Sequence, residues 1–367
     1  MARVPFDPKE VSNATEAPGM FPGMMVKRFD TPISPKENYR MVYDRKIPYW
    51  LPGFNDMQMI TPRIDADNLA RVFSFEAQPM APEEMQGCPD KYGVPWVYVD
   101  QAMGSMVVPG DPILKDVNDW PDVIQFPDVA SWDWDGSREA NKDFIKTDKW
   151  FTYCHLTGYF ERLISFMDFE NAAMALVDPD QKEAAKALMM AIADNNIEIF
   201  SKAYNAYGFD CLNVHDDWGA QRAPFFSLEV CMEMIVPAIK KVVDFAHNEL
   251  GVPYDFHSCG KNELLVPAYI AAGADSWSGQ DMNDKAMLYE KYGDKLILGI
   301  EPDLKVEFMG PMPPLDDAIA SAQRFLDKYI PGYKEKPVLF GFFFGPPGFD
   351  DFMYEATRNA FNALAEA

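Results

Sequence analysis

The sequence lacks the features that mark several common classes of protein. Basic residues number 33 against 57 acidic ones, which leaves a net charge of −24. We therefore expect no nucleic-acid partner, because phosphate binding depends on a basic surface. No apolar run approaches the ~18 residues that a membrane span needs, and the first residues have no apolar core of a signal peptide. The chain is accordingly expected to work in the cytoplasm, without membrane association.

Cysteine is scarce and irregularly spaced. The five residues form an odd set, so a disulfide framework is not expected. Four of them are interpreted as small buried apolar residues, namely Cys88, Cys154, Cys211 and Cys231. Cys259 differs because polar residues surround it. Neither a G-x-G-x-x-G sequence after a strand nor a phosphate-binding P-loop is present, which removes support for two nucleotide-binding folds.

After about residue 150 the sequence alternates regularly between short apolar runs and helical stretches. This alternation favours an α/β protein with a parallel sheet and helical crossovers, although it does not by itself separate a closed barrel from an open sheet. We expect residues 1–33 to form an N-terminal arm and residues 34–367 to form one domain. Strands are predicted at Phe151–His155, Cys211–His215, Tyr254–His257, Ala274–Trp277, Leu296–Ile300 and Val338–Phe343.

Some residues predict where helices begin, bend and end. Ser34 and Pro35 suit the cap and the first turn of a helix that runs to about Tyr43. Gly208 is expected to end a helix over 181–207. Pro237 is expected to kink a helix over 227–249.

Polar residues that directly follow the strands are the candidates for chemistry, because they gather at one mouth of a barrel. His257 and Cys259 are two residues apart at a strand end, so their side chains point to the same side and could bind one zinc ion. A pair of this kind is a weak signal by itself, and a buried histidine beside a buried cysteine is the plainer alternative. Glu301 follows another strand and is either a third ligand or an ordinary loop acid.

The segment His215-Asp216-Asp217-Trp218, at the end of a strand, contains two adjacent carboxylates. Two adjacent carboxylates are costly to bury together, which suggests a ligand, a proton donor or a substrate anchor, with helix capping as the alternative. Asp217 and Asp216 are therefore the candidate catalytic acids. Substrate contacts are assigned to other residues near the same mouth, namely His155, Tyr159, His215, Trp218 and Gln280. For His155 and Tyr159 the alternative is a place in the core.

An ordered series of motifs resembles the uroporphyrinogen decarboxylase superfamily. The dense part runs from Asp216-Asp217-Trp218-Gly219 through His257-Ser258-Cys259-Gly260 to Leu298-Gly299-Ile300-Glu301-Pro302. Earlier, Ser34-Pro35-Lys36-Glu37-Asn38-Tyr39-Arg40 and Ile47-Pro48-Tyr49-Trp50 look like the opening helix and first strand of that family. The resemblance implies a (β/α)8 barrel of the TIM type.

Within this superfamily the H-x-C-G sequence is similar to that of the cobalamin-dependent methyltransferases, which hold zinc partly through such a pair. The arginine-rich N-terminal motif of the decarboxylases is not found. A further zinc-binding cysteine that the coenzyme M methyltransferases carry near the last strand is missing from Phe340–Gly348. A zinc with one thiolate favours an oxygen-bound methyl group over a thiol. The resemblance thus points to the O-demethylase type, with zinc on His257, Cys259 and Glu301.

The implied reaction moves a methyl group from a methoxylated, aromatic substrate to the Co(I) of cobalamin. The resemblance implies that this cobalamin is carried by a separate corrinoid protein. The alternatives are a lyase that decarboxylates a porphyrinogen or another small acid, and a barrel that only binds partners. The sequence does not decide the oligomeric state, and a homodimer is one of the options.

Overall fold

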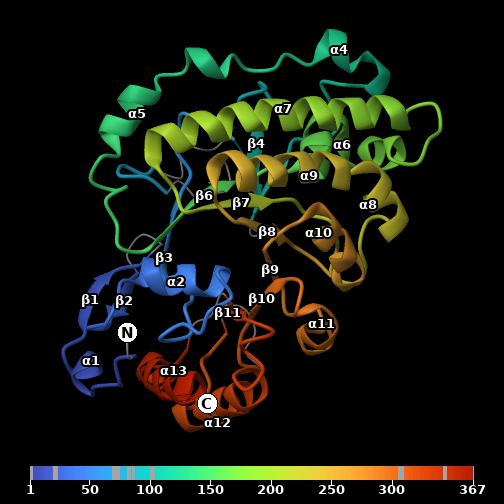
Figure 1. The fold of residues 1–367 in the computed structure, drawn as a ribbon. Coiled ribbons are helices and arrows are strands. Elements are labelled where there is room, and N and C mark those ends of the chain that lie inside the picture. The colour runs from blue at the N-terminus through green and yellow to red at the C-terminus, as the bar shows by residue number, and fades with distance from the viewer. Residues whose placement is uncertain are drawn as a thin grey trace. The chain divides into compact units, whose positions relative to one another are not determined.

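The computed structural model describes residues 3–19, 24–67, 75–80, 84, 87–99, 104–304, 310–341 and 345–366. Its contacts divide the chain into two compact units (Figure 1). The first unit contains Met1–Gln58, Thr147–Trp150 and Lys285–Ala367, and the second contains Met59–Lys146 and Phe151–Asp284. An arm over 1–33 followed by one domain over 34–367 stays a prediction.

The second unit is built on parallel strands that neighbour one another in chain order. β6 (Trp150–His155) pairs with β7 (Cys211–His215), which pairs with β8 (Tyr254–Ser258), which pairs with β9 (Ser276–Gly279). On its other side β6 neighbours β3 (Met57–Ile60). Every residue of β6 is buried, as expected for a parallel strand that is covered on both faces.

Helices follow these strands, and the longest, α7 (Lys182–Tyr207), packs along α9 (Val236–Phe245) (Figure 1). α7 ends where Gly208 adopts the left-handed φ of 67°, as the sequence predicted. The expected break at Pro237 is confirmed, because one helix ends at Met234 and α9 begins at Val236. The other helices of this unit are η3 (Val117–Asp119), α4 (Trp120–Val123), η4 (Val129–Ser131), α5 (Trp134–Ala140), α6 (Tyr159–Ala175), α8 (Leu228–Met234), η5 (Ala246–Leu250), η6 (Glu263–Leu265) and α10 (Val266–Ala272).

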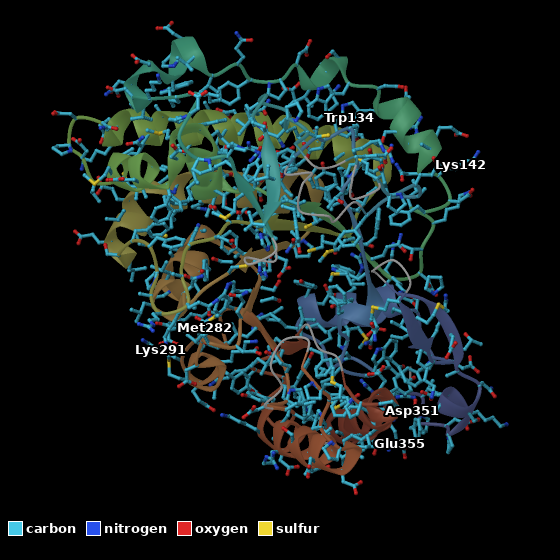
Figure 2. The ribbon with its side chains drawn as sticks, turned by 180° about the vertical axis from the view of Figure 1, so that it is seen from behind. Trp134, Lys142, Met282, Lys291, Asp351 and Glu355 are labelled. Carbon is cyan, nitrogen blue, oxygen red and sulfur yellow. The ribbon has the colours of Figure 1, made fainter. Side chains whose placement is uncertain are left out.

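A separate antiparallel pair, β4 (Trp96–Val99) and β5 (Gly104–Val107), lies in the same unit. The surface of the unit carries charged side chains such as Lys142, which forms an exposed ion pair with Glu139 (Figure 2).

The first unit contains the parallel pair β10 (Ile297–Ile300) and β11 (Val338–Phe340). The backbone N–H of Phe340 donates to the carbonyl oxygen of Pro52 at 3.0 Å, so the segment before η1 (Phe54–Asp56) lies beside β11. Residues 342 and 343 of the strand predicted over Val338–Phe343 lie outside the described residues. The helices of this unit are α1 (Lys9–Ser12), α2 (Pro35–Tyr43), α11 (Lys285–Tyr292), α12 (Leu315–Tyr329) and α13 (Phe349–Glu366).

The N-terminal segment has more structure than the sequence indicated. It forms α1 and an antiparallel hairpin of β1 (Thr15–Pro18) and β2 (Met25–Arg28). Glu10 anchors it: the buried Arg358 on α13 donates from Nε and Nη2 to its carboxylate, each at 2.8 Å. The strands are short and largely exposed, so they lack the apolar alternation by which a strand is recognised.

The cap of α2 is as predicted. Ser34 accepts from the backbone of Glu37, whose carboxylate accepts in return from Ser34 N–H, and Pro35 lies in the first turn.

The parallel strands and their flanking helices confirm the expectation of an α/β protein, and the closed eight-stranded barrel stays a prediction. None of the described helices is long and apolar enough to cross a membrane.

None of the five cysteines forms a disulfide. Cys154, Cys211 and Cys231 are buried, as expected, whereas Cys88 is partly exposed, because it lies in a loop before β4 rather than in the core.

Candidate metal centre

The candidate site forms where β7 and β8 end side by side in the second unit. In the register of this parallel pair, His215 is the direct neighbour of His257. Their imidazole rings stack with centroids 4.1 Å apart and planes 6° apart. Carboxyl ends of parallel strands are the usual place for ligands in α/β proteins, because loops and helix N-termini converge there.

His257 and Cys259 lie on the same side of the chain, as strand alternation predicted. The Nε2 atom of His257 is 3.5 Å from the Sγ atom of Cys259. Ligand atoms of His215, His257 and Cys259 all lie within 4.8 Å of one another, and all three side chains are partly exposed. Two imidazoles and a thiolate are ligands that zinc prefers, and three protein ligands with an open position are typical of catalytic zinc. The donor set therefore fits zinc.

Two carboxylates border the same site. Ligand atoms of Glu161, His215 and Asp217 also lie within 4.8 Å of one another. Glu161 belongs to the first turn of α6, and Asp217 follows β7. The Oδ1 atom of Asp217 accepts a hydrogen bond from the backbone N–H of Cys259 at 2.9 Å, which fixes the position of the cysteine. His215 therefore belongs to two clusters, one with His257 and Cys259 and the other with Glu161 and Asp217.

Asp216 points the other way and caps α6. Its carboxylate accepts from the backbone N–H groups of Tyr159, Phe160 and Glu161 at 2.8, 3.0 and 2.9 Å. Burial raises the pKa of Asp216 to about 6, even though these donors favour the ionised form. A helix N-terminus leaves several N–H groups without helical partners, and a carboxylate satisfies them. For Asp216 the structure therefore favours the capping alternative over catalysis.

The loop after β8 has little freedom. Gly260 has a φ of +90°, and a Cβ atom there would lie 2.1 Å from the carbonyl oxygen of Gly219. Its N–H donates to Oε1 of Gln280 at 2.7 Å. Asn262 Nδ2 donates to Ser258 Oγ at 2.8 Å. In this structure Gln280, expected at the substrate, instead holds the loop that carries Cys259.

Two of the other predicted substrate contacts are core residues. The side chain of Trp218 is fully buried and lies 5.0 Å, between ring centroids, from each of Phe256 and Tyr269. Tyr159 is 1% exposed, and its hydroxyl donates to the carbonyl oxygen of Ala238. Both side chains are therefore packed in the core in this conformation, and a contact with the substrate stays a prediction for each of them.

His155 lies in a buried charge network that the sequence did not reveal. Its Nδ1 atom is 3.6 Å from Asp65 and 3.8 Å from Asp67. Lys91 pairs with Asp65 at 2.8 Å, and Arg162 pairs with Asp67 at 2.6 Å and with Asp90. Burial opposes ionisation of Asp65, but the charges of Lys91 and His155 outweigh it and leave its pKa well below the usual value. Asp65 and Asp67 follow β3, and this position was the only sequence signal for them.

Glu301, predicted as the third zinc ligand, belongs to the first unit. There it forms an ion pair with Lys285, and its Oε2 atom lies against the backbone of Gly341. Zinc coordination by Glu301 stays a prediction. In the second unit, the third donor that the structure brings to His257 and Cys259 is His215, which the sequence had placed at the substrate.

Comparison with solved structures supports the fold. A methyltransferase from Methanosarcina mazei matches with a TM-score of 0.54 and 12% sequence identity, over 91% of this chain and 100% of that chain. A sugar phosphate isomerase/epimerase from Parabacteroides distasonis covers 70% of this chain and 99% of its own, at 11% identity and a TM-score of 0.24 that carries no argument. No family profile matches the sequence, and neither does any curated protein sequence.

Proposed function

We propose that this chain is a zinc-dependent methyltransferase of the O-demethylase type within the uroporphyrinogen decarboxylase superfamily. It would move a methyl group from a methoxylated aromatic compound to the Co(I) of cobalamin on a separate corrinoid protein. The observation that carries the proposal is the approach of His215, His257 and Cys259 within 4.8 Å at the ends of two adjacent strands. The fold shared with a methyltransferase from Methanosarcina mazei agrees with it.

These three residues would hold the zinc. When bound there, zinc would supply a Lewis acid toward the ether oxygen of the substrate. The residues that flank the site have separate tasks. Asp217 holds Cys259 in position, because its carboxylate accepts a hydrogen bond from the backbone N–H of Cys259 at 2.9 Å. Through its other oxygen Asp217 would supply the proton that the leaving phenolate oxygen needs.

The electron balance requires a nucleophile from outside the chain. The methyl carbon leaves oxygen without the bonding electrons, which stay on the phenolate, and the electron pair of Co(I) forms the new bond. The phenolate then takes up a proton. In-line approach to the methyl group would require the open side of the site to face the partner.

Metal content and methyl transfer test the proposal. We expect one zinc per chain in the purified protein. The variants His215→Ala and Cys259→Ala should lose this zinc, since each removes one ligand. His247→Ala and Cys88→Ala are matched controls, because His247 pairs with Asp275 and Cys88 lies outside the site. These controls should keep their zinc.

The reaction is followed by the spectral change of Co(I) to methyl-Co(III) on the purified corrinoid protein. Methoxylated aromatics are compared with methylated thiols and amines. Activity with thiols or amines alone would contradict the oxygen donor. Release of CO2 from a porphyrinogen by the metal-free protein would instead support the lyase alternative.

A further inference from the structure

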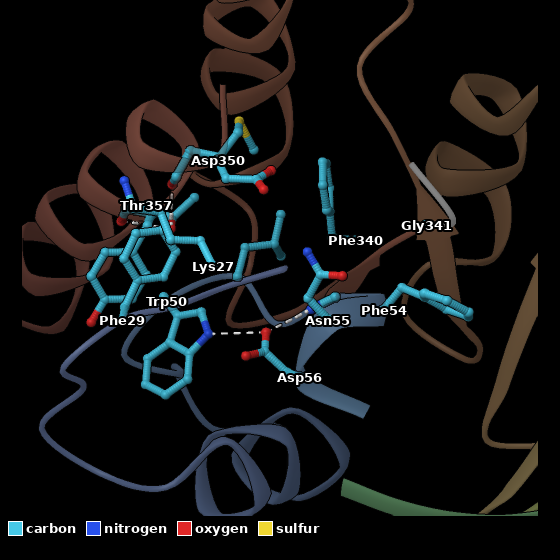
Figure 3. Close-up of a pocket in the computed structure, with 14 residues that line it drawn as sticks. Lys27, Phe29, Trp50, Phe54, Asn55, Asp56, Phe340, Gly341, Asp350 and Thr357 are labelled. Atoms are coloured by element: carbon cyan, nitrogen blue, oxygen red, sulfur yellow. Dashed lines mark hydrogen bonds between the residues drawn. The ribbon is translucent and has the colours of Figure 1, made fainter. Parts of the chain in front are cut away.

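The first unit contains a pocket that the proposed reaction does not use. It has a volume of about 80 Å³ and lies between the segment Trp50–Asp56, the residues that follow β11, and the start of α13 (Figure 3). Every residue that lines it belongs to the first unit. Gly341, which follows β11, forms part of its wall. The pocket therefore opens at a carboxyl end of a parallel strand, where α/β proteins usually bind ligands.

Aromatic rings make up much of the wall. They come from separate elements and are held by packing: Phe29 stacks on Tyr354 with centroids 4.1 Å apart, and Trp50 lies 5.8 Å from Tyr354. Phe54 and Phe340 complete this set (Figure 3). The faces of aromatic rings carry partial negative charge and attract cations.

The wall also contains polar groups, two of which are carboxylates. One oxygen of Asp56, Oδ2, accepts from Trp50 Nε1 and from the backbone of Gly53, both at 3.1 Å. The structure describes no hydrogen bond to the other oxygen. Asp350 supplies a second carboxylate, and Figure 3 shows the Asn55 amide near the same space.

The cation in the wall is already paired. Lys27 donates to both carboxylate oxygens of Asp351, at 2.5 and 2.7 Å, and Asp351 lies outside the lining. Burial raises the pKa of Asp56 to about 6; the charge of Lys149 opposes this rise, and the charge of Asp350 makes a smaller contribution in the same direction as burial. A bound positive charge would favour the ionised form of both carboxylates, whereas an anion would oppose it.

We propose that this pocket binds a small alkylammonium ion. Aromatic walls combined with carboxylates are the chemistry that recognises such ions, since the rings contact the alkyl groups and the carboxylates balance the charge. Size limits the ligand further, because a cavity of about 150 Å³ holds benzene. A pocket of about 80 Å³ suits a smaller molecule, such as methylammonium.

Binding of methylammonium, measured by isothermal titration calorimetry or ligand-detected NMR, tests this assignment. The neutral comparison is methanol, which has the same number of heavy atoms. Sodium chloride keeps the ionic strength constant, because the net charge of −24 attracts any cation weakly. We expect saturable binding of the cation, about 10-fold tighter than that of the alcohol, from cation–π attraction and charge together.

Two variants locate the site. Asp350→Asn removes one pocket carboxylate, and Phe54→Leu removes one aromatic face. Each should weaken binding by about 3- to 10-fold. Asp316→Asn is the matched control, because it makes the same charge change in the first turn of another helix, α12, outside the pocket.

Three results would overturn the proposal: no saturable binding, equal binding of the alcohol, or equal weakening by Asp316→Asn and Asp350→Asn. Thermal unfolding of each variant checks that the fold is intact. Zinc content and methyl transfer are separate measurements, so failure here leaves the proposed function untouched.

Discussion

The two neighbouring carboxylates at the end of β7 should behave differently on mutation, and Asp216→Asn is the sharper test. Asp216 is fully buried, and burial raises its pKa to about 6 from an ordinary 3.8. A carboxyl with a raised pKa stabilises the fold when it is protonated, and this contribution is lost as the pH rises through about 6. Asparagine resembles the protonated acid but does not titrate, so the variant should lose the pH dependence.

The size of the effect follows from the pKa. At about pH 5 the folded carboxyl lies one unit below its pKa of about 6 and is mostly protonated, while in the unfolded chain it is mostly ionised. One unit corresponds to about 1.4 kcal/mol. The free energy of unfolding of the wild type should therefore gain about 1.4 kcal/mol over that of Asp216→Asn when the pH falls from about 8 to about 5. A constant loss of about 1–3 kcal/mol should accompany the change, because an amide has one oxygen for three N–H donors.

Urea unfolding at the two pH values measures both quantities, with a chelator present so that no metal perturbs the carboxylates. The other titrating groups are common to wild type and variant and cancel in the difference. Asp180→Asn, at an exposed position, should show no such pH-dependent difference from the wild type. If the wild type and Asp216→Asn differ by the same amount at both pH values, the account of Asp216 as a buried cap is wrong.

Three further predictions concern the site and the N-terminal segment. Asp217→Asn keeps an acceptor for Cys259 N–H, so zinc content should stay near normal while methyl transfer falls by about 10²–10⁴-fold; loss of zinc would instead make Asp217 a ligand. Gly260→Ala should cost about 1–3 kcal/mol in thermal or urea unfolding from its φ of +90° alone, and should lower zinc content, because Gly219 blocks the new methyl group. Glu10→Gln leaves Arg358 buried without its partner and should lower the free energy of unfolding in urea by about 3–5 kcal/mol. Burial raises the pKa of Glu10, but Arg358 and Tyr354 more than reverse this and leave it below its ordinary value, so this stabilisation should be lost on acidification.

Local signals in the sequence predicted local structure well. The cap at Ser34, the helix end at Gly208 and the break at Pro237 each depend on the chemistry of one or two residues. The same-side placement of His257 and Cys259 also follows from alternation within one strand. The hairpin of β1 and β2 was missed because its strands are short and Val26 is their only buried residue.

Which residues meet at the site depends on the register between β7 and β8, and the sequence does not specify this register. His215 and His257 are 42 positions apart, and only the pairing of β7 with β8 makes them neighbours. The separate roles of the two acids were nevertheless open to prediction. Alternation places His215 and Asp217 on one side of the chain and Asp216 on the other, so residue spacing alone is enough to distinguish Asp217 from Asp216.

The replacement of Glu301 by His215 in the proposed ligand set changes the charge of the site. A zinc ion with one thiolate and one carboxylate has no net charge, whereas a zinc ion with one thiolate and two neutral imidazoles keeps a charge of +1. The second combination draws electrons more strongly from an oxygen atom and is less suited to activating a thiol. His215 therefore strengthens the case for an oxygen-bound methyl donor, which the missing second cysteine had suggested.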